Sequence, residues 1–216
     1  MPDNPSIPII FVTAFVIGFS GAMMPGPLLA YTISSSAKYG FWAGPLIVLG
    51  HAILELSLVT LLVLGLDRFI ENDLVTSTIG LAGGTVLIVM GFLMSRQGWH
   101  KATLPLETPT SIEVNRRMIF SGIVVSMSNP YWFIWWATIG VTYLLWSLEL
   151  GTAGIASFFT GHILSDLSWY ALVSFVIATG RKAINDTVYS YLLMVCGLAL
   201  VGLGGYFVFS GIEFLI

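Results

Sequence analysis

The sequence predicts an all-α integral membrane protein with six transmembrane helices, arranged as two inverted three-helix repeats in which the first and fourth helices are broken. Three observations predict this fold class. The chain of 216 residues is 56% hydrophobic and only 9% charged, whereas soluble domains carry about 25% charged residues. It contains six long apolar runs, and a bilayer span needs roughly 20 apolar residues. Motifs of the first half also recur in the second half.

Glycine, proline and charged residues separate the six apolar runs. The runs cover residues 7–37, 40–66, 75–94, 118–146, 151–179 and 187–209. No Lys or Arg precedes Lys38, so the first run lacks the basic start of a cleaved signal peptide and is expected to be a retained span. We expect a single transmembrane domain, with three-helix repeats at residues 1–95 and 118–216 joined by a cytoplasmic linker at residues 96–117.

The basic residues predict the orientation, because Lys and Arg in short loops stay on the cytoplasmic side. Only Arg68 lies in a loop on the other side. The other seven of the eight lie in or beside the first, third and fifth loops, which share one side: Lys38, Arg96, Lys101, Arg116, Arg117, Arg181 and Lys182. We therefore expect a multi-pass protein of the inner (cytoplasmic) membrane with both termini outside.

Two motifs predict the internal repeat. Gly50-His51-x-x-x-Glu55 in the second run recurs as Gly161-His162-x-x-x-Asp166 in the fifth run. Gly84 and Gly91 of the third run match Gly197 and Gly204 of the sixth, at nearly the same offset between the halves. Each half contains an odd number of spans, so the second half enters the membrane from the opposite side. This is the inverted-topology repeat found in many secondary transporters.

Each half also opens with an interrupted helix. Met24-Pro25-Gly26-Pro27 interrupts the first run and Ser128-Asn129-Pro130 interrupts the fourth. Proline removes a backbone donor, and unwound backbone at membrane depth is tolerated only where it lines a cavity or is buried in protein. Helix starts exposed at such breaks attract anionic groups such as a carboxylate. We assign Gly26, Pro27, Asn129 and Pro130 to substrate binding, with plain proline kinks as the alternative.

The second and fifth runs carry ionisable residues at bilayer depth. His51 and Glu55 lie four residues apart and so share one helix face, and His162 and Asp166 repeat this arrangement. Such residues cost about 3 kcal/mol or more each at the membrane centre, so they are expected to face the bundle interior. A carboxylate beside an imidazole suits a group that takes up and releases protons. We assign all four residues to proton coupling.

Two alternatives to proton coupling stay open. The His and acidic side chains could simply satisfy one another and clamp the two repeats together, as in a non-transporting scaffold. Two imidazoles and two carboxylates that converge could also ligate a zinc-like ion, which would make the protein a divalent metal exporter. The tryptophans that follow the second break, at positions 132, 135 and 136, are assigned to an aromatic belt or a core in preference to a substrate path.

Other function classes find little support. The net charge is −3 and the basic residues are scattered, so nucleic acid is not an expected partner. Cys196 is the single cysteine, which excludes an intrachain disulfide and a multi-cysteine metal site. No Ser-His pair, twin-Asp motif or His-Glu-x-x-His helix indicates an enzyme. We expect neither a cofactor nor a resident metal, and the sequence leaves open whether chains associate as a homo-oligomer.

The chain resembles the LysE/RhtB family of amino-acid exporters. The resemblance rests on Pro25-Gly26-Pro27, on Gly40-x-x-x-Gly44-Pro45, on Ser128-Asn129-Pro130, and on the third run with its Gly83-Gly84, Leu87, Ile88 and Gly91. It covers essentially the whole chain. It implies six spans and export of amino acids or related small solutes, generally driven by the proton motive force. The family also has relatives proposed to export cadmium.

Two positions depart from the family pattern. Tyr131 stands directly after the Asn-Pro pair, where the family often has Lys, and His51 with Glu55 stand where an Asp close to a glycine is common. A lysine specificity is therefore not inferred. Taken together, the residues and the resemblance predict a secondary transporter that exports an amino acid or similar small solute in exchange for protons.

Overall fold

The computed structural model describes residues 6–24, 26–64, 73–100, 112–180 and 185–213, and within these ranges every regular element is helical. The elements follow one another as α1 (Ile7–Ala22), α2 (Pro27–Tyr39), α3 (Ala43–Val63), α4 (Asp73–Trp99), α5 (Ile112–Met127), α6 (Pro130–Trp135), the π-helical segment η2 (Trp136–Gly140), α7 (Val141–Leu148), α8 (Gly151–Gly180) and α9 (Asp186–Glu213). The all-α prediction is confirmed for these residues.

The first apolar run is broken where the sequence predicts it. Helices α1 and α2 meet at an angle of 81°. Gly26 caps α2 with extended backbone, and Pro27 occupies the first turn. A proline fits there because the first amides of a helix have no intrahelical acceptor to lose. Pro25 lies outside the described residues.

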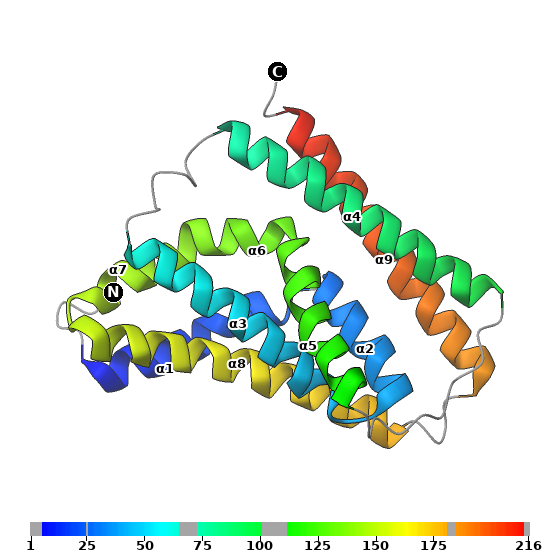
Figure 1. The fold of residues 1–216 in the computed structure, drawn as a ribbon, viewed down its shortest axis with the longest axis horizontal. Helices are drawn as coiled ribbons and strands as arrows, with labels where there is room; N and C mark the ends of the chain where they lie inside the picture. The colour runs from blue at the N-terminus through cyan, green and yellow to red at the C-terminus, as the bar shows by residue number, and fades with distance from the viewer. Residues whose placement is uncertain (1–5, 25, 65–72, 101–111, 181–184, 214–216) are drawn as a thin grey trace.

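The second break also places a proline in the first turn of a new helix, and three helical segments, α6, η2 and α7, follow it. α5 ends at Met127, and the Asn129 side chain caps α6 by accepting a hydrogen bond from the Tyr131 amide at 3.2 Å. In Figure 1 the chain turns sharply between α5 and α6. A π-helical turn, η2, then joins α6 to α7. Asn129 and Pro130 therefore begin a new helix, as Gly26 and Pro27 do.

The helices pack in pairs from opposite halves of the chain. α1 lies along α8, α3 lies along α5, and α4 lies along α9 as a pair on one side of the molecule (Figure 1). Glycines permit the closest approaches. A Cβ on Gly84 would overlap the carbonyl of Gly204, and one on Gly91 would overlap the carbonyl of Gly197.

Glycines also permit close contact between α3 and α5 and between α8 and α1. A Cβ on Gly50 of α3 would overlap the Ile119 carbonyl of α5, and one on Gly161 of α8 would meet the Phe11 carbonyl of α1. Gly50 and Gly161 occupy the same position of the repeated motif. In the predicted repeat their partners Ile119 and Phe11 correspond as well, so the α3–α5 and α8–α1 contacts are arranged as that repeat predicts.

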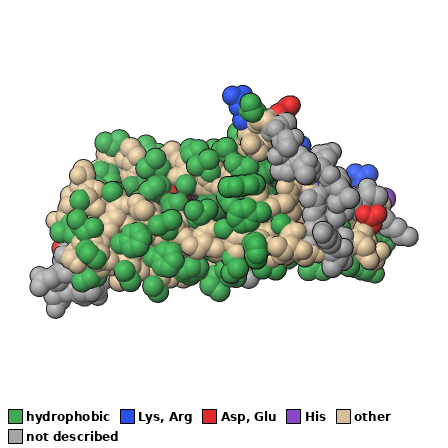
Figure 2. Space-filling view, turned by 90° about the horizontal axis from the view of Figure 1, so that it is seen from below, with side chains coloured by type: hydrophobic (Ala, Val, Ile, Leu, Met, Phe, Trp, Pro, Cys, Tyr) green, Lys and Arg blue, Asp and Glu red, His purple; other side chains and the backbone are tan. Residues whose placement is uncertain are grey.

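The outer surface is apolar, as a protein in lipid requires. Large hydrophobic side chains such as Leu64, Phe120 and Val195 are exposed. Figure 2 shows hydrophobic side chains spread across one face, with charged side chains mainly on the protruding upper part and at the right-hand end. Three described helices are long and apolar enough to cross a membrane, namely Ala43–Val63, Gly151–Gly180 and the Asp186–Tyr206 part of α9. The bent pair α1 and α2 makes a fourth if it is one span.

The two remaining predicted spans are not among these membrane-length helices. Residues 75–94 lie within α4, and residues 118–146 are spread over α5, α6, η2 and α7. α4 runs to Trp99 and α5 begins at Ile112, so both ends of the predicted linker at 96–117 are helical, while residues 101–111 lie outside the described part. Six crossings and the inverted repeat remain predictions at this point.

Candidate functional site

Four buried ionisable side chains converge between α3 and α8. The Glu55 carboxylate lies 3.1 Å from His51 Nε2 through Oε1, and 3.0 Å from His162 Nε2 through Oε2. The Asp166 Oδ2 atom lies 3.7 Å from each of these two Nε2 atoms. All four side chains are buried. We call this set the His/acid cluster; each acid contacts the histidines of both halves.

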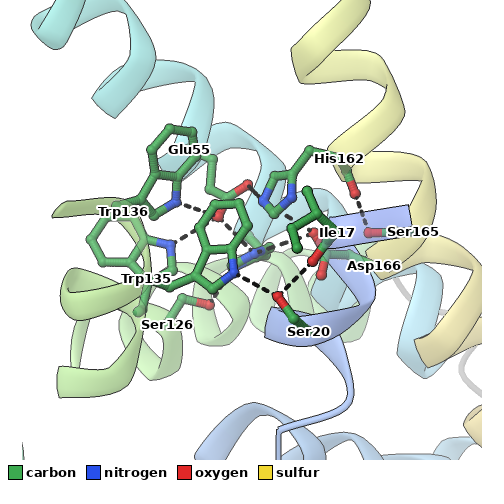
Figure 3. Close-up of polar contacts among 11 residues, drawn as sticks. Ile17, Ser20, Glu55, Ser126, Trp135, Trp136, His162, Ser165 and Asp166 are labelled. Carbon is green, nitrogen blue, oxygen red and sulfur yellow. Dashed lines mark hydrogen bonds and ion pairs between the residues drawn. The ribbon is translucent and has the colours of Figure 1, made fainter. Parts of the chain in front are cut away.

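Two tryptophans complete the surroundings of Glu55. Trp132 and Trp136 donate their indole N–H groups to Glu55 Oε1, at 2.9 and 2.7 Å. Figure 3 shows Trp135 and Trp136 on the same side of the cluster. Trp132, Trp135 and Trp136 belong to one buried cluster, as the core assignment predicts, and Trp132 and Trp135 also line the central cavity. Their role as donors was missed, although positions 132 and 136 have the spacing that places two side chains on one helix face.

Asp166 is held quite differently from Glu55. Its Oδ2 atom is buried and makes no hydrogen bond within the described part of the chain. Glu55 accepts two indole hydrogen bonds through Oε1, whereas its buried Oε2 atom also makes no hydrogen bond among the described residues and lies 3.0 Å from His162 Nε2. Each acid therefore has one oxygen with capacity for a further group, and the Asp166 oxygen lies farther from the two imidazoles, at 3.7 Å.

The two histidines also differ in whether the Nδ1 atom has a hydrogen-bonding partner. His51 Nδ1 is 2.8 Å from the Ser126 hydroxyl of α5. His162 instead stacks on Trp135, with ring centroids 4.5 Å apart, and its Nδ1 has no hydrogen-bond partner among the described residues. A Cβ on Gly18 of α1 would lie 3.0 Å from that Nδ1. In the predicted repeat Gly18 corresponds to Ser126, because the step along the sequence from Gly18 to Ser126 equals the step from Phe11 to Ile119.

The cluster and both helix breaks line one small cavity. Its volume open to water-sized molecules is about 40 Å³, enough for a few waters. Gly26 and Asn129 line this cavity together with the four cluster residues. A Cβ on Gly26 would lie 3.6 Å from Asn129 Nδ2, so the two breaks are neighbours. Pro27 is buried at the start of α2, and Pro130 starts α6 directly after Asn129.

The comparison with protein families covers most of the chain. The family model of the LysE type translocator matches residues 19–211. The chain belongs to the LysE type translocator family. Because the match includes both breaks and the whole cluster, the resemblance stated from the motifs is confirmed. This LysE type translocator is thus a multi-pass membrane protein of a transporter family.

Two curated relatives are similar to this LysE type translocator over nearly their whole length. The chemotactic transduction protein ChpE of Pseudomonas aeruginosa is 27% identical over 199 residues, 91% of this chain and 96% of the relative. YcgF of Bacillus subtilis, whose name proposes amino acid efflux, is 24% identical over 205 residues, 94% of this chain and 97% of the relative. No solved structure matches the translocator.

The donor set of the cluster also fits a divalent metal ion as cargo. One ligand atom from each of His51, Glu55, His162 and Asp166 lies within 4.8 Å of all the others. Tetrahedral ligands at the 2.0–2.2 Å typical of zinc stand about 3.4 Å apart. The imidazole–carboxylate distances run from 3.0 to 3.7 Å, with Glu55 facing His51 through Oε1 and His162 through Oε2. Ser126 on His51 Nδ1 resembles the outer partner that orients a metal-binding imidazole. His162 has no such partner among the described residues.

Proposed function

We propose that this LysE type translocator exports an amino acid or a similar small solute across the cytoplasmic membrane in exchange for protons. One observation carries the proposal: the two helix breaks and the four cluster residues line the same buried cavity. In secondary transporters, broken helices from two repeats frame the substrate site near the bilayer midplane. The family match and the amino acid efflux named for YcgF support the solute class.

The proposed topology has six spans in two inverted repeats, residues 1–95 and 118–216, joined by a cytoplasmic linker at 96–117, with both termini outside. The matched contacts support it. A two-fold operation that exchanges Gly84 with Gly197 also exchanges Gly91 with Gly204, and it converts the Gly84–Gly204 approach into the Gly197–Gly91 approach. The same operation converts the His51–Asp166 contact into the His162–Glu55 contact.

Each end of a zwitterionic solute has a matching group in the cavity. The start of α2 after Gly26 offers backbone amides to a carboxylate, because the first amides of a helix have no intrahelical acceptor. Asn129 lies beside this position and lines the same cavity. Asp166, whose Oδ2 is without a hydrogen bond within the described ranges, would hold either a proton or the ammonium group of the solute. Because the carboxylate holds only one of the two at a time, the solute leaves when a proton binds, and this couples solute release to proton uptake.

Two buried apolar clusters lie beside this cavity. One contains Trp132, Trp136 and Phe158, and the other contains Leu28, Ile47 and Met118. Trp132 and Leu28 also line the cavity itself. In the proposed mechanism, one repeat rocks against the other and opens these layers alternately, so that the central site faces one side at a time.

The test uses the purified protein in vesicles loaded with an equimolar mixture of the twenty amino acids. We expect a more acidic external buffer to accelerate efflux of one or a few of them, measured by mass spectrometry, while an internal pH dye reports proton entry. Glu55→Gln should abolish the acceleration and keep solute-for-solute exchange, whereas Asp166→Asn also loses the carboxylate that holds the ammonium group and should abolish both. Glu149→Gln, at an exposed acid near the end of α7, is the matched control. Full proton-driven efflux in both folded cluster variants would overturn the coupling assignment.

A divalent metal ion is the second candidate cargo, because one ligand atom from each of the four cluster residues lies within 4.8 Å of the others. Thermal unfolding of the purified protein with zinc or cadmium tests it, since a ligand of the folded state raises its stability by mass action. A rise that His51→Gln and His162→Gln remove, with no response to amino acids, would put the metal exporter first. The scaffold alternative is weakened by the cavity and by the Asp166 Oδ2 atom that lacks a hydrogen bond in the described structure.

A further inference from the structure

A second and larger pocket opens between α2, α4, α5 and α9, at the ends of these helices that carry Lys38, Arg96 and Arg117. Its volume is about 330 Å³, several times that of the central cavity at about 40 Å³. The described residues that line it include Tyr31, Ser34, Ser35, Lys38, Tyr39, Gln97, Arg117, Met118 and Tyr189. We call this space the basic pocket. The proposed function makes no use of it.

Two cationic side chains are among the described residues that line this pocket. Lys38 comes from α2 and Arg117 from α5, and no Asp or Glu is among the described lining residues. The Lys38 ammonium lies 4.8 Å from the centroid of the Tyr39 ring, a cation–π contact that holds it at the pocket wall. Serine and tyrosine hydroxyls and the Gln97 amide surround the two cations. Two cations among hydroxyl groups suit an anionic oxygen group, a carboxylate or a phosphate.

One apolar layer connects the basic pocket with the central cavity. Met118 lines the pocket and belongs to the buried cluster that also contains Leu28 and Tyr170. Leu28 and Tyr170 in turn line the central cavity. Helix α2 takes part in both spaces, with Gly26 at the cavity and Lys38 at the pocket. A solute in the basic pocket therefore stands one layer of side chains away from the His/acid cluster.

We propose that the basic pocket is a second binding site, which captures the carboxylate of the solute through Lys38 and Arg117 before it enters the central cavity. The inference rests on the proposed export function and on the cytoplasmic location of these basic residues. A pair of cations at an entrance raises the local concentration of an anionic group and thereby speeds its capture. The pocket then governs apparent affinity from the cytoplasmic side, and the central cavity governs turnover.

The first arm of the test measures transport in vesicles of phosphatidylcholine alone. We expect Lys38→Gln with Arg117→Gln to raise the apparent KM for the solute on the pocket side by about fivefold, with kcat unchanged. Lys38→Arg with Arg117→Lys, which keeps both charges, should restore the KM. Arg116→Gln is the matched control, because it removes the neighbouring charge on α5 that is not among the lining residues. An unchanged KM, or an equal effect of the control, would overturn the proposal.

The second arm does not depend on transport. Acetate and inorganic phosphate should stabilise the wild type and the Glu55→Gln variant against heat, and the loss of both pocket charges should remove this effect. Persistence of the effect in the double variant would overturn the proposal. If the wild type carries no amino acid but still shows this anion effect, the proposed function has failed and the anion site stands.

A lipid phosphate is the other source of the same chemistry. Phosphatidylglycerol in the vesicles would then stabilise the wild type and not the Lys38→Gln with Arg117→Gln variant, while the KM for the solute would be equal in both. That combination would overturn capture of the solute in favour of a lipid headgroup.

Discussion

Ser126 and His51 lie 2.8 Å apart, hydroxyl oxygen to Nδ1, and this contact fixes the imidazole from the side opposite to Glu55. In the predicted repeat the corresponding position of the first half is Gly18, which has no side chain to offer His162. The two histidines of a symmetric motif are therefore inequivalent. His51 is anchored by a polar contact, and His162 is held by stacking on Trp135.

We predict that Ser126→Ala weakens both the fold and export. The change leaves a buried imidazole nitrogen without a partner, which costs about 1–3 kcal/mol. Thermal unfolding in detergent gives the stability effect, and vesicle efflux gives the transport effect. Ser168→Ala is the control, because the Ser168 hydroxyl donates to the Leu164 carbonyl of its own helix on the exposed face. Equal behaviour of the two variants would contradict a role for the Ser126 contact.

The indole donors to Glu55 make a second prediction. Trp136→Phe keeps an aromatic ring in the buried cluster but removes the 2.7 Å hydrogen bond to Glu55 Oε1. A hydrogen bond to a charged group contributes about 1.5–3 kcal/mol, so we expect a loss of stability in that range and altered proton coupling. Trp146→Phe is the control, since Trp146 is buried in the same cluster and makes an edge contact with Tyr143. Proton-driven efflux measured on both variants should decline only in the first.

The matched glycines make a prediction about symmetry. A Cβ at Gly50 would overlap the Ile119 carbonyl, and one at Gly161 would meet the Phe11 carbonyl, so Gly50→Ala and Gly161→Ala should both destabilise the protein. Overpacking of this kind costs about 1–3 kcal/mol. Gly205→Ala should be neutral or stabilising, because a Cβ there has nothing within 4 Å among the described surroundings. Unfolding temperatures that rank Gly205→Ala with the other two would refute the close packing.

Asn129 allows capping and substrate contact to be separated. Its side chain accepts the Tyr131 amide at the start of α6, and Asn129→Ala should cost about 1 kcal/mol of stability. Serine also caps helices well, so Asn129→Ser should retain most of that stability. If the amide also contacts solute, Asn129→Ser will raise the KM for export without lowering the unfolding temperature. Restoration of both stability and KM by serine would limit Asn129 to capping.

The sequence carries enough information to find the parts of the site, because each part is costly in an apolar run. A carboxylate four residues from a histidine, or a proline inside a span, has few neutral explanations. That His51 approaches Asp166 across the two halves was beyond the sequence, since spacing along one helix says nothing about a contact between helices. The repeat motif made the approach a reasonable expectation, but only the packing of α3 against α8 brings the four side chains together.

The partners of the cluster were harder to predict. A serine such as Ser126 or a tryptophan such as Trp136 is common in membrane helices, and neither is costly enough to indicate a role. The register that relates α1 to α5 emerges from the contacts at Gly50 and Gly161. Once it is known, it assigns Gly18 to Ser126 and exposes the asymmetry of the two imidazoles. Side-chain partners of this kind follow from tertiary geometry and not from residue type.

The π-helical turn at Trp136–Gly140 limits the insertions and deletions that this part of the chain tolerates. A π-turn holds one residue more than an α-turn, so it rotates everything after it by about 100° relative to an uninterrupted helix. Trp136 is the first residue of this turn and contacts Glu55, whereas Leu144 and Trp146 lie beyond the turn and enter the same buried cluster. Deletion of one residue here would turn α7 off the core while leaving Trp132 in place. Between positions 136 and 140, the length of the chain is therefore under stronger constraint than the identity of most of its residues.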